Sequence, residues 1–167
     1  MHSAQYWIDR LALGAHPEGG FYRETYRSDR SVSTEGSGGD TGLVRAASTV
    51  IYFLLNGDDF SALHRLRSDE TWHFYVGGTL VVHVIAAEGQ ALEMFLGADP
   101  DKNESFQVVV RAGCWFGSRL RESNSFALVG CTVAPGFEFE DFELGKREDL
   151  LVQFPQHREL ITKLTRE

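Results

Sequence analysis

The chain has 167 residues, of which 43% are hydrophobic, 12% aromatic and 24% charged, a composition typical of one folded domain and unlike that of a disordered chain. Its net charge is −8, and its few basic clusters are interrupted by apolar or acidic residues, so nucleic acid is not an expected partner. No apolar run approaches the length of a membrane span and the N-terminus lacks a secretory pattern, so we expect a cytoplasmic protein whose Cys114 and Cys131 stay free thiols in the core.

The N-terminal residues predict a short helix followed by a sharp turn. Residues 4–13 place apolar side chains at helical spacing, Ser3 can cap the start and Gly14 can end the helix. The segment "AHPEGG" then predicts a turn, in which His16 and Glu18 have local hydrogen bonding as their default role.

The next stretch, "FYRETYRS", alternates as a β-strand does. On a regular strand Arg23, Thr25 and Arg27 share one face. Arg23 is a candidate contact for an acidic substrate, and an ion pair with Glu18 or another acidic neighbour is the competing interpretation. Residues 30–42 are polar and rich in glycine, which predicts a flexible loop within the domain.

From Ala46 to Leu144 the chain is a series of short β-like runs separated by glycine-rich turns. This pattern indicates an antiparallel barrel or double-sheet sandwich and not a parallel α/β fold. Residues 145–167 return to helical spacing and predict a short helical tail on the barrel. We therefore expect one domain, residues 1–167, of the all-β class, with a short N-terminal helix.

The stretch "HRLRSDETWHFYVGG" concentrates the side chains that can do chemistry. If its two halves are adjacent strands, His64 and Glu70 can both point into the barrel and approach each other. An imidazole and a carboxylate can form an acid/base pair or bind a divalent metal, although two ligands alone do not make a dedicated metal site.

On a regular strand, Glu70, Trp72 and Phe74 share one face while His73 lies on the other. His73 then reaches the cavity only through a β-bulge, and otherwise belongs to a subunit contact or a hydrogen bond in the core. A carboxylate at Glu70 among aromatic side chains is costly to bury, which favours a functional role for it.

The positions of Gly57, His64, Glu70 and Gly77 resemble the first motif of the cupin superfamily, which frames a metal site in a small barrel. Two ligand positions of the cupin motifs are apolar here: Leu66 replaces the second histidine, and Phe116 stands where the last ligand would be.

Five ordered motifs over about residues 3–145 resemble the DUF985 branch of the cupins. They are "HPEGGFYRETYRS", "TVIYFLL", "SDETWHFYVGG", "AGCWFG" and "PGFEFEDFEL". The resemblance implies a cupin jelly roll related to the dTDP-sugar epimerase type, in a family of uncharacterised function.

Three functions follow as hypotheses. In the first, His64, Glu70 and His73 are acid/base groups of an epimerase- or isomerase-like enzyme for a small polar or anionic metabolite, with Arg23, Trp72 and Phe116 as substrate contacts. In the second, His64, Glu70 and His73 hold a divalent metal in an oxygenase-like cupin; otherwise no cofactor is expected. In the third, the barrel is a non-catalytic sensor or storage-type protein. We also expect a homodimer, because the N-terminal strand could add to a partner's sheet.

Overall fold

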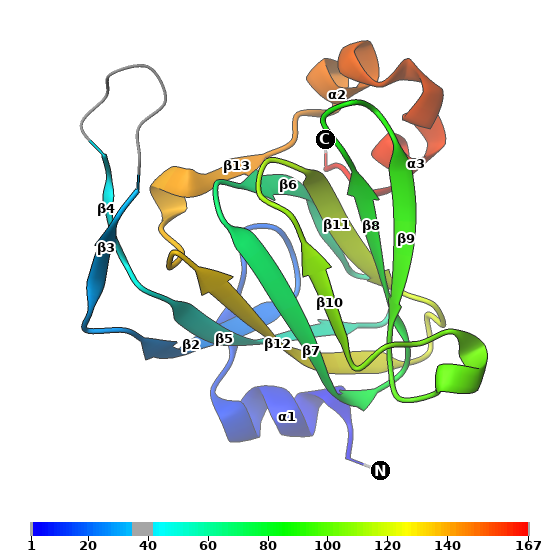
Figure 1. The fold of residues 1–167 in the computed structure, drawn as a ribbon. Helices are drawn as coiled ribbons and strands as arrows, with labels where there is room; N and C mark the ends of the chain where they lie inside the picture. The colour runs from blue at the N-terminus through cyan, green and yellow to red at the C-terminus, as the bar shows by residue number, and fades with distance from the viewer. Residues whose placement is uncertain (1, 35–41, 167) are drawn as a thin grey trace.

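The computed structural model describes residues 2–34 and 42–166, which fold into two antiparallel β-sheets that face each other, as Figure 1 shows. The first sheet has the strand order β1 (Gly14–Ala15), β2 (Phe21–Arg27), β5 (Thr49–Asn56), β12 (Phe126–Ala134), β7 (Asp69–Gly77) and β10 (Gln107–Val110). The second has the order β13 (Phe142–Leu144), β6 (Phe60–Leu66), β11 (Trp115–Leu120), β8 (Leu80–Ile85) and β9 (Ala91–Leu96). The predicted all-β jelly roll is confirmed.

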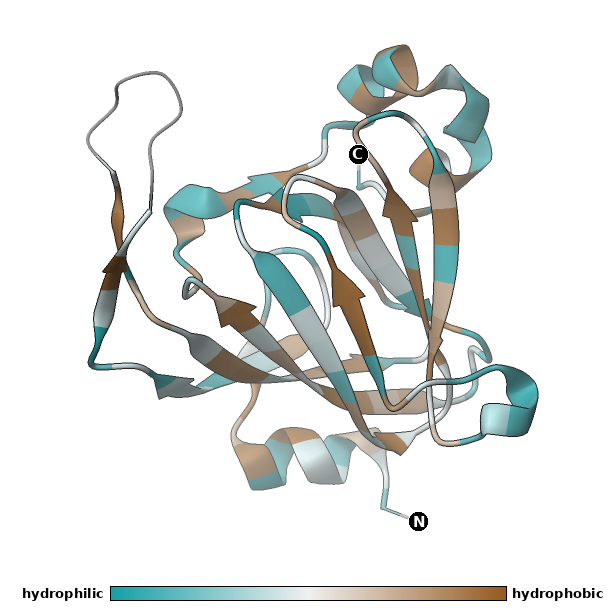
Figure 2. Cartoon of the chain, viewed as in Figure 1, coloured by the Kyte–Doolittle hydropathy of each residue, from teal (hydrophilic) through white to brown (hydrophobic). Residues whose placement is uncertain are grey.

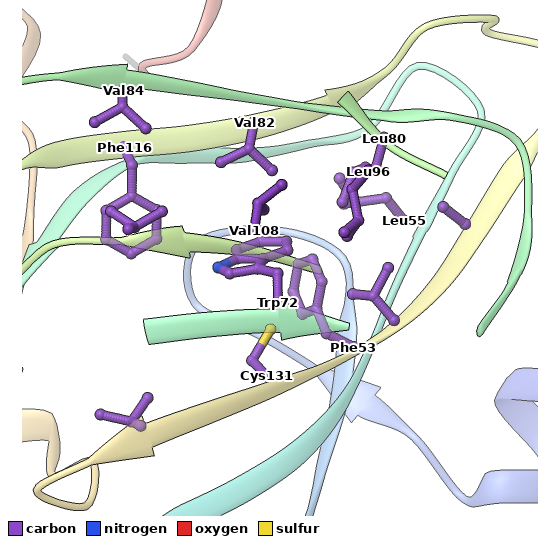
Figure 3. Packing of buried hydrophobic residues seen from close by; sticks show 14 of the residues in the cluster. Phe53, Leu55, Trp72, Leu80, Val82, Val84, Leu96, Val108, Phe116 and Cys131 are labelled. Carbon is purple, nitrogen blue, oxygen red and sulfur yellow. The ribbon is translucent and has the colours of Figure 1, made fainter. Parts of the chain in front are cut away.

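The core lies between the sheets because alternate side chains of each strand point inward. Figure 3 shows Trp72 and Phe53 of the first sheet beside Val82 and Phe116 of the second, with the sulfur of Cys131 near the Trp72 ring. The indole and phenyl rings of Trp72 and Phe53 meet edge to face, with centroids 5.7 Å apart. The packing leaves room at one end of the barrel, where the inward side chains become polar.

The N-terminal helix α1 (Ala4–Leu11) starts at Ser3, whose hydroxyl accepts the backbone N–H of Tyr6 at 3.2 Å. The predicted cap is therefore confirmed, but the end at Gly14 is wrong: the helix stops at Ala12, which adopts the left-handed conformation with φ of 50°. In Figure 2 the helix shows both apolar and polar residues, and its apolar side chains pack on the outer face of the first sheet around Leu54 and Leu128.

The predicted loop at residues 30–42 is in part a β-hairpin. Strands β3 (Ser31–Ser33) and β4 (Val44–Ala46) pair antiparallel and form an arm beside the barrel (Figure 1), so this part of the loop prediction is wrong. Residues 35–41 lie outside the described residues. Strand β2 pairs with β5 of its own chain, and in the described residues no strand covers its other edge beyond Tyr22, so the homodimer stays a prediction.

The C-terminal tail forms α2 (Arg147–Gln153), η3 (Pro155–His157) and α3 (Arg158–Lys163), which confirms the predicted helical tail. Leu150, Phe154 and Ile161 bury their side chains against Leu63 and other residues of the second sheet's outer face. Two further short helices, η1 (Pro100–Lys102) and η2 (Phe139–Asp141), lie in connections between strands. None of the described helices has the length and apolar character needed to cross a bilayer.

Candidate functional site

A cavity of about 470 Å³ opens into the barrel between the two sheets. This volume lies within the range of about 300–1,000 Å³ typical of small-molecule sites. Its inner wall is made of buried titratable and aromatic side chains, and its mouth carries exposed charges. The titratable and thiol-bearing lining residues are His16, Glu18, Arg23, Glu24, Arg27, His64, Glu70, Cys131 and Glu138, and the aromatic ones are Tyr22, Phe53, Trp72, Phe137, Phe139 and Phe142.

Glu18 is the hub of the inner wall. Its side chain is buried, with one oxygen accepting the Ser61 hydroxyl at 2.8 Å and the other 3.2 Å from Nε2 of His64. The same oxygen lies 3.6 Å from Nδ1 of His16. Ser61 and His64 therefore contact one carboxyl directly, and His16, whose Nδ1 accepts the backbone N–H of Glu18 at 3.3 Å, lies just beyond hydrogen-bond distance of it.

The hydrogen bonds determine which nitrogen of His64 carries its proton. Nδ1 lies 2.7 Å from the carbonyl of Ala62, which can only accept, so Nδ1 holds the hydrogen and Nε2 presents its lone pair to Glu18. Burial lowers the pKa of His64 to about 4, while burial, partly offset by His16 and by the Ser61 hydrogen bond, raises the pKa of Glu18 to about 7. Below about pH 7 the proton of the pair is therefore carried by Glu18, which donates it to Nε2 of His64.

Glu70 projects from β7, where it lies opposite Val110 and Val133 on the neighbouring strands. The Trp72 indole donates to one carboxyl oxygen at 2.9 Å. Burial, followed by the charge of nearby Glu18, raises the pKa of Glu70 to about 8, so this carboxyl is mainly protonated near neutral pH. The cavity therefore contains a neutral carboxylic acid that can donate a proton.

Cys131 lies on β12 beside this carboxyl, and burial followed by the charge of Glu70 holds its pKa well above the ordinary thiol range. It is a buried thiol of the core, as predicted, but it also lines the cavity. Cys114 is also a free thiol; it is only partly buried and packs against the edge of the core.

Arg27 lies at the mouth of the cavity, although a regular strand would place it on the face opposite to Glu24. β2 changes register between Glu24 and Tyr26, so the extra residue at Thr25 turns Arg27 toward the cavity beside Glu24. Arg27 donates to the Glu24 carboxylate at 3.0 and 2.8 Å and to Glu138. Arg23 also lines the cavity but is exposed, and among the described residues its guanidinium has no hydrogen-bond or ion-pair partner.

Not all of the predicted site residues come together. His64, Glu70 and Trp72 line the cavity, whereas His73 does not. The register change in β7 falls between Phe74 and Val76, after His73, so it leaves the imidazole on the outer face of the sheet. There His73 contacts the Thr132 hydroxyl at 3.0 Å and the Gln107 amide at 2.9 Å.

The predicted metal set does not fit this geometry, because His73 is on the other side of the sheet from His64 and Glu70. Within residues 2–34 and 42–166 no group of three or more His, Cys, Asp or Glu side chains is arranged to hold a metal ion. Phe116, predicted as a substrate contact, is instead buried behind His64, with ring centroids 4.1 Å apart. It supports the imidazole and is not part of the cavity wall.

The turn that carries His16 and Glu18 is anchored by residues distant in sequence. Gly19 and Gly20 have φ of 114° and 72°, values that side-chain-bearing residues rarely adopt. The backbone N–H of Gly20 donates to Asp59 at 2.8 Å, and Arg166 binds the same carboxylate at 2.9 Å and the Glu18 carbonyl at 3.4 Å. The turn is thus a fixed part of the wall, and its two titratable residues were missed because their spacing from His64 carries no motif.

Two facing antiparallel sheets around a cavity form a jelly-roll barrel, the architecture of the cupins among other proteins. The chain belongs to the family described as Cupin superfamily (DUF985), whose model matches residues 5–145. It is similar in structure to protein SO0799 from Shewanella oneidensis, with 42% identity, 99% of each chain covered and a TM-score of 0.88. A hypothetical protein from Leishmania major has 36% identity and a TM-score of 0.91, with coverage of 99% of this chain and 100% of that one.

Two further comparisons give no specific activity. The uncharacterized protein YML079W of Saccharomyces cerevisiae is 32% identical over 157 residues, which are 89% of this chain and 78% of that protein. Oxalate decarboxylase of Bacillus subtilis is 15% identical, with a TM-score of 0.55 over 91% of this chain and 37% of that one. At that identity the likeness concerns the fold alone. The chain is therefore a member of a cupin family whose activity is uncharacterised.

Proposed function

We propose that the barrel cavity binds a small polar metabolite and catalyses a proton-transfer reaction of the isomerase or epimerase type. The observation that carries this proposal is the pair of buried carboxyls, Glu18 and Glu70, whose pKa values are raised to about 7 and about 8. Acid/base catalysis is most effective when the catalytic pKa lies near the working pH. Burying a carboxyl without a cation costs free energy, which favours a functional role for the pair.

The two carboxyls have different partners, which suggests different roles. Glu70 is protonated and has the indole of Trp72 as its donor, so it is suited to deliver a proton. Glu18 shares one proton with His64, so the pair can accept a proton after losing its own to the substrate or solvent. An acid and a base in one cavity are what the removal and return of a substrate proton require.

The other residues of the cavity wall favour a small ligand that has a flat or apolar face as well as polar groups. Aromatic side chains such as Tyr22 and Phe137 supply the apolar surface, and the unpartnered guanidinium of Arg23 at the mouth supports an anionic group on the ligand. The predicted contacts Arg23 and Trp72 stay in this proposal, and His73 and Phe116 leave it because neither lines the cavity.

The test is wash-in of solvent deuterium, because a reversible proton abstraction exchanges the substrate hydrogen even when no product accumulates. The protein would be incubated in D₂O with a panel of sugars and small hydroxy- and keto-acids, and each compound followed by proton NMR. We expect exchange in at least one compound, lost in Glu70→Gln and in His64→Gln and kept in Arg10→Gln, a change at an exposed residue of α1.

Native mass spectrometry of the same preparations separates the alternatives. A compound that binds the wild-type cavity without deuterium exchange would refute catalysis and support a sensor or storage-type barrel. Exchange that survives both the Glu70 and the His64 substitutions would remove these residues from the mechanism.

A further inference from the structure

A second cavity lies on the outer face of the second sheet, separate from the barrel interior. It has a volume of about 310 Å³ and is bounded by β8, β9 and β11 on one side and by η3 and α3 on the other. Figure 1 shows α3 at the ends of β8 and β9. Its described lining residues are His83, Glu93, Arg119, Gln156, His157, Glu159, Leu160, Lys163 and Leu164, none of which lines the first cavity.

His83 is the unusual group in this wall. Only 3% of its surface is exposed, and among the described residues neither ring nitrogen has a hydrogen-bond partner. Nδ1 is 3.1 Å from a carboxylate oxygen of Glu93, directly opposite on β9, but without hydrogen-bond geometry. Buried polar groups are nearly always hydrogen-bonded, so an orphan imidazole at the edge of a polar cavity indicates a missing partner.

The charges around His83 show what kind of partner is missing. Lys163 and Glu159 of α3 neutralise each other at 2.7 Å, and Glu93 faces the imidazole. Arg119 of β11 is exposed and has no partner among the described residues, although it is close enough for its charge to act on His83. While His83 is neutral, two charged groups of the wall therefore lack a counter-ion: the Glu93 carboxylate, which faces the imidazole, and the Arg119 guanidinium, which is free to take an anion.

The remaining neighbours add no charged partner for Arg119. Nε2 of His157, on η3, is already occupied, because it donates to the carbonyl of Gly89 at 2.8 Å. With His83 neutral, the two cations and two carboxylates of the cavity cancel. An anion that enters together with one proton, taken up by His83, keeps this balance.

We propose that this cavity is a second ligand site that takes a small oxyanion, a carboxylate or a phosphate, held by the guanidinium of Arg119 beside the imidazole of His83. Guanidinium groups match the geometry of both oxyanions. A metal ion would instead face Arg119 and Lys163, and would find no group of three donor side chains in the described residues. The proposal does not depend on the function of the barrel cavity.

Burial is the main cause that lowers the pKa of His83; Glu93 raises it, and Arg119 and Lys163 lower it further. A bound anion would reverse the effect of the two cations and stabilise the imidazolium. Binding should therefore be coupled to proton uptake and weaken as pH rises, by at most about tenfold per pH unit for one proton.

The experiment is an NMR titration of the full chain, labelled with ¹⁵N, in which the ring signals of His83 are followed during addition of sodium acetate or inorganic phosphate. We expect a saturable shift with at least one probe, an affinity about tenfold or more lower in Arg119→Gln, and no change in Arg10→Gln. Acetate serves for the comparison of pH 6 with pH 8, because its own charge is constant there, and we expect the tighter binding at pH 6.

Which probe saturates the signal identifies the carboxylate or the phosphate as the favoured class. The proposal is overturned if neither probe gives a saturable shift, if Arg119→Gln binds as the wild type does, or if the acetate affinity is the same at both pH values. Because Arg119 is exposed, its substitution leaves the core intact, and the unchanged backbone spectrum of the variant verifies this.

Discussion

Replacing Glu70 by glutamine should make the protein more stable, and increasingly so as the pH rises. Burial raises the pKa of Glu70 from 4.5 to about 8, so the folded state resists ionisation that the unfolded state permits. The stability that depends on Glu70 is therefore fully present below pH 4.5 and is progressively lost as the pH rises toward 8. Glutamine keeps the size of the side chain and an oxygen for the Trp72 indole, but does not titrate.

The magnitude follows from the two pKa values. With about 1.4 kcal/mol per pKa unit, the gain in unfolding free energy of Glu70→Gln over wild type should grow by roughly 3 kcal/mol between pH 5 and pH 8. In a chain of this length that corresponds to roughly 6–12 °C in the difference between the melting temperatures. Glu18 titrates in both proteins, so its contribution cancels to first order in this comparison.

Urea denaturation of both proteins at pH 5 and pH 8, with Glu88→Gln as a control, measures the effect. Glu88 lies exposed in the turn between β8 and β9, so its substitution should give no pH-dependent gain. An equal difference between Glu70→Gln and wild type at both pH values would refute the raised pKa. A stabilised variant that loses deuterium exchange would show that stability is sacrificed at this position for function.

Two further predictions concern the site and the fold. Trp72→Phe removes the donor that favours the ionised form of Glu70, so the Glu70 titration midpoint, followed by carbon NMR of ¹³C-labelled carboxyls, should move up; an unchanged midpoint would exclude this role for the indole. Leu150→Ala should cost about 2–5 kcal/mol of unfolding free energy, because the side chain is 1% exposed between α2 and the second sheet. Val152→Ala, on the same helix but 84% exposed, should change stability by less than about 0.5 kcal/mol, and equal effects of the two substitutions in urea would contradict this packing.

The alternation of apolar residues and the glycine-rich turns were sufficient to predict the barrel, because each strand has its own local pattern. The same alternation correctly placed Glu70 and Trp72 on the inner face of β7 and His73 on the outer one. The alternation was wrong at Arg27, because the one-residue irregularity at Thr25 exchanges the inner and outer faces of β2 and cannot be recognised from the composition.

The partners of His64 could not be predicted for a different reason. Glu18 is far from it along the chain and meets it only when the turn after β1 packs on β6, where the backbone N–H of Ala62 donates to the Glu18 carbonyl at 2.8 Å. His16 and Glu18 have an ordinary local role in such turns, so only the three-dimensional arrangement reveals them. The arm formed by β3 and β4 was missed because its polar strands lack the apolar alternation of a buried sheet.

The bonds from Arg166 to the turn that carries Glu18 connect residues separated by 148 positions. During synthesis on a ribosome, the strands of the barrel, the last of which ends at Leu144, emerge before Arg166 does. The nascent barrel can therefore bury its apolar faces while the wall of its cavity still lacks one of its supports. The support of the cavity wall is in this way added after the strands that surround it.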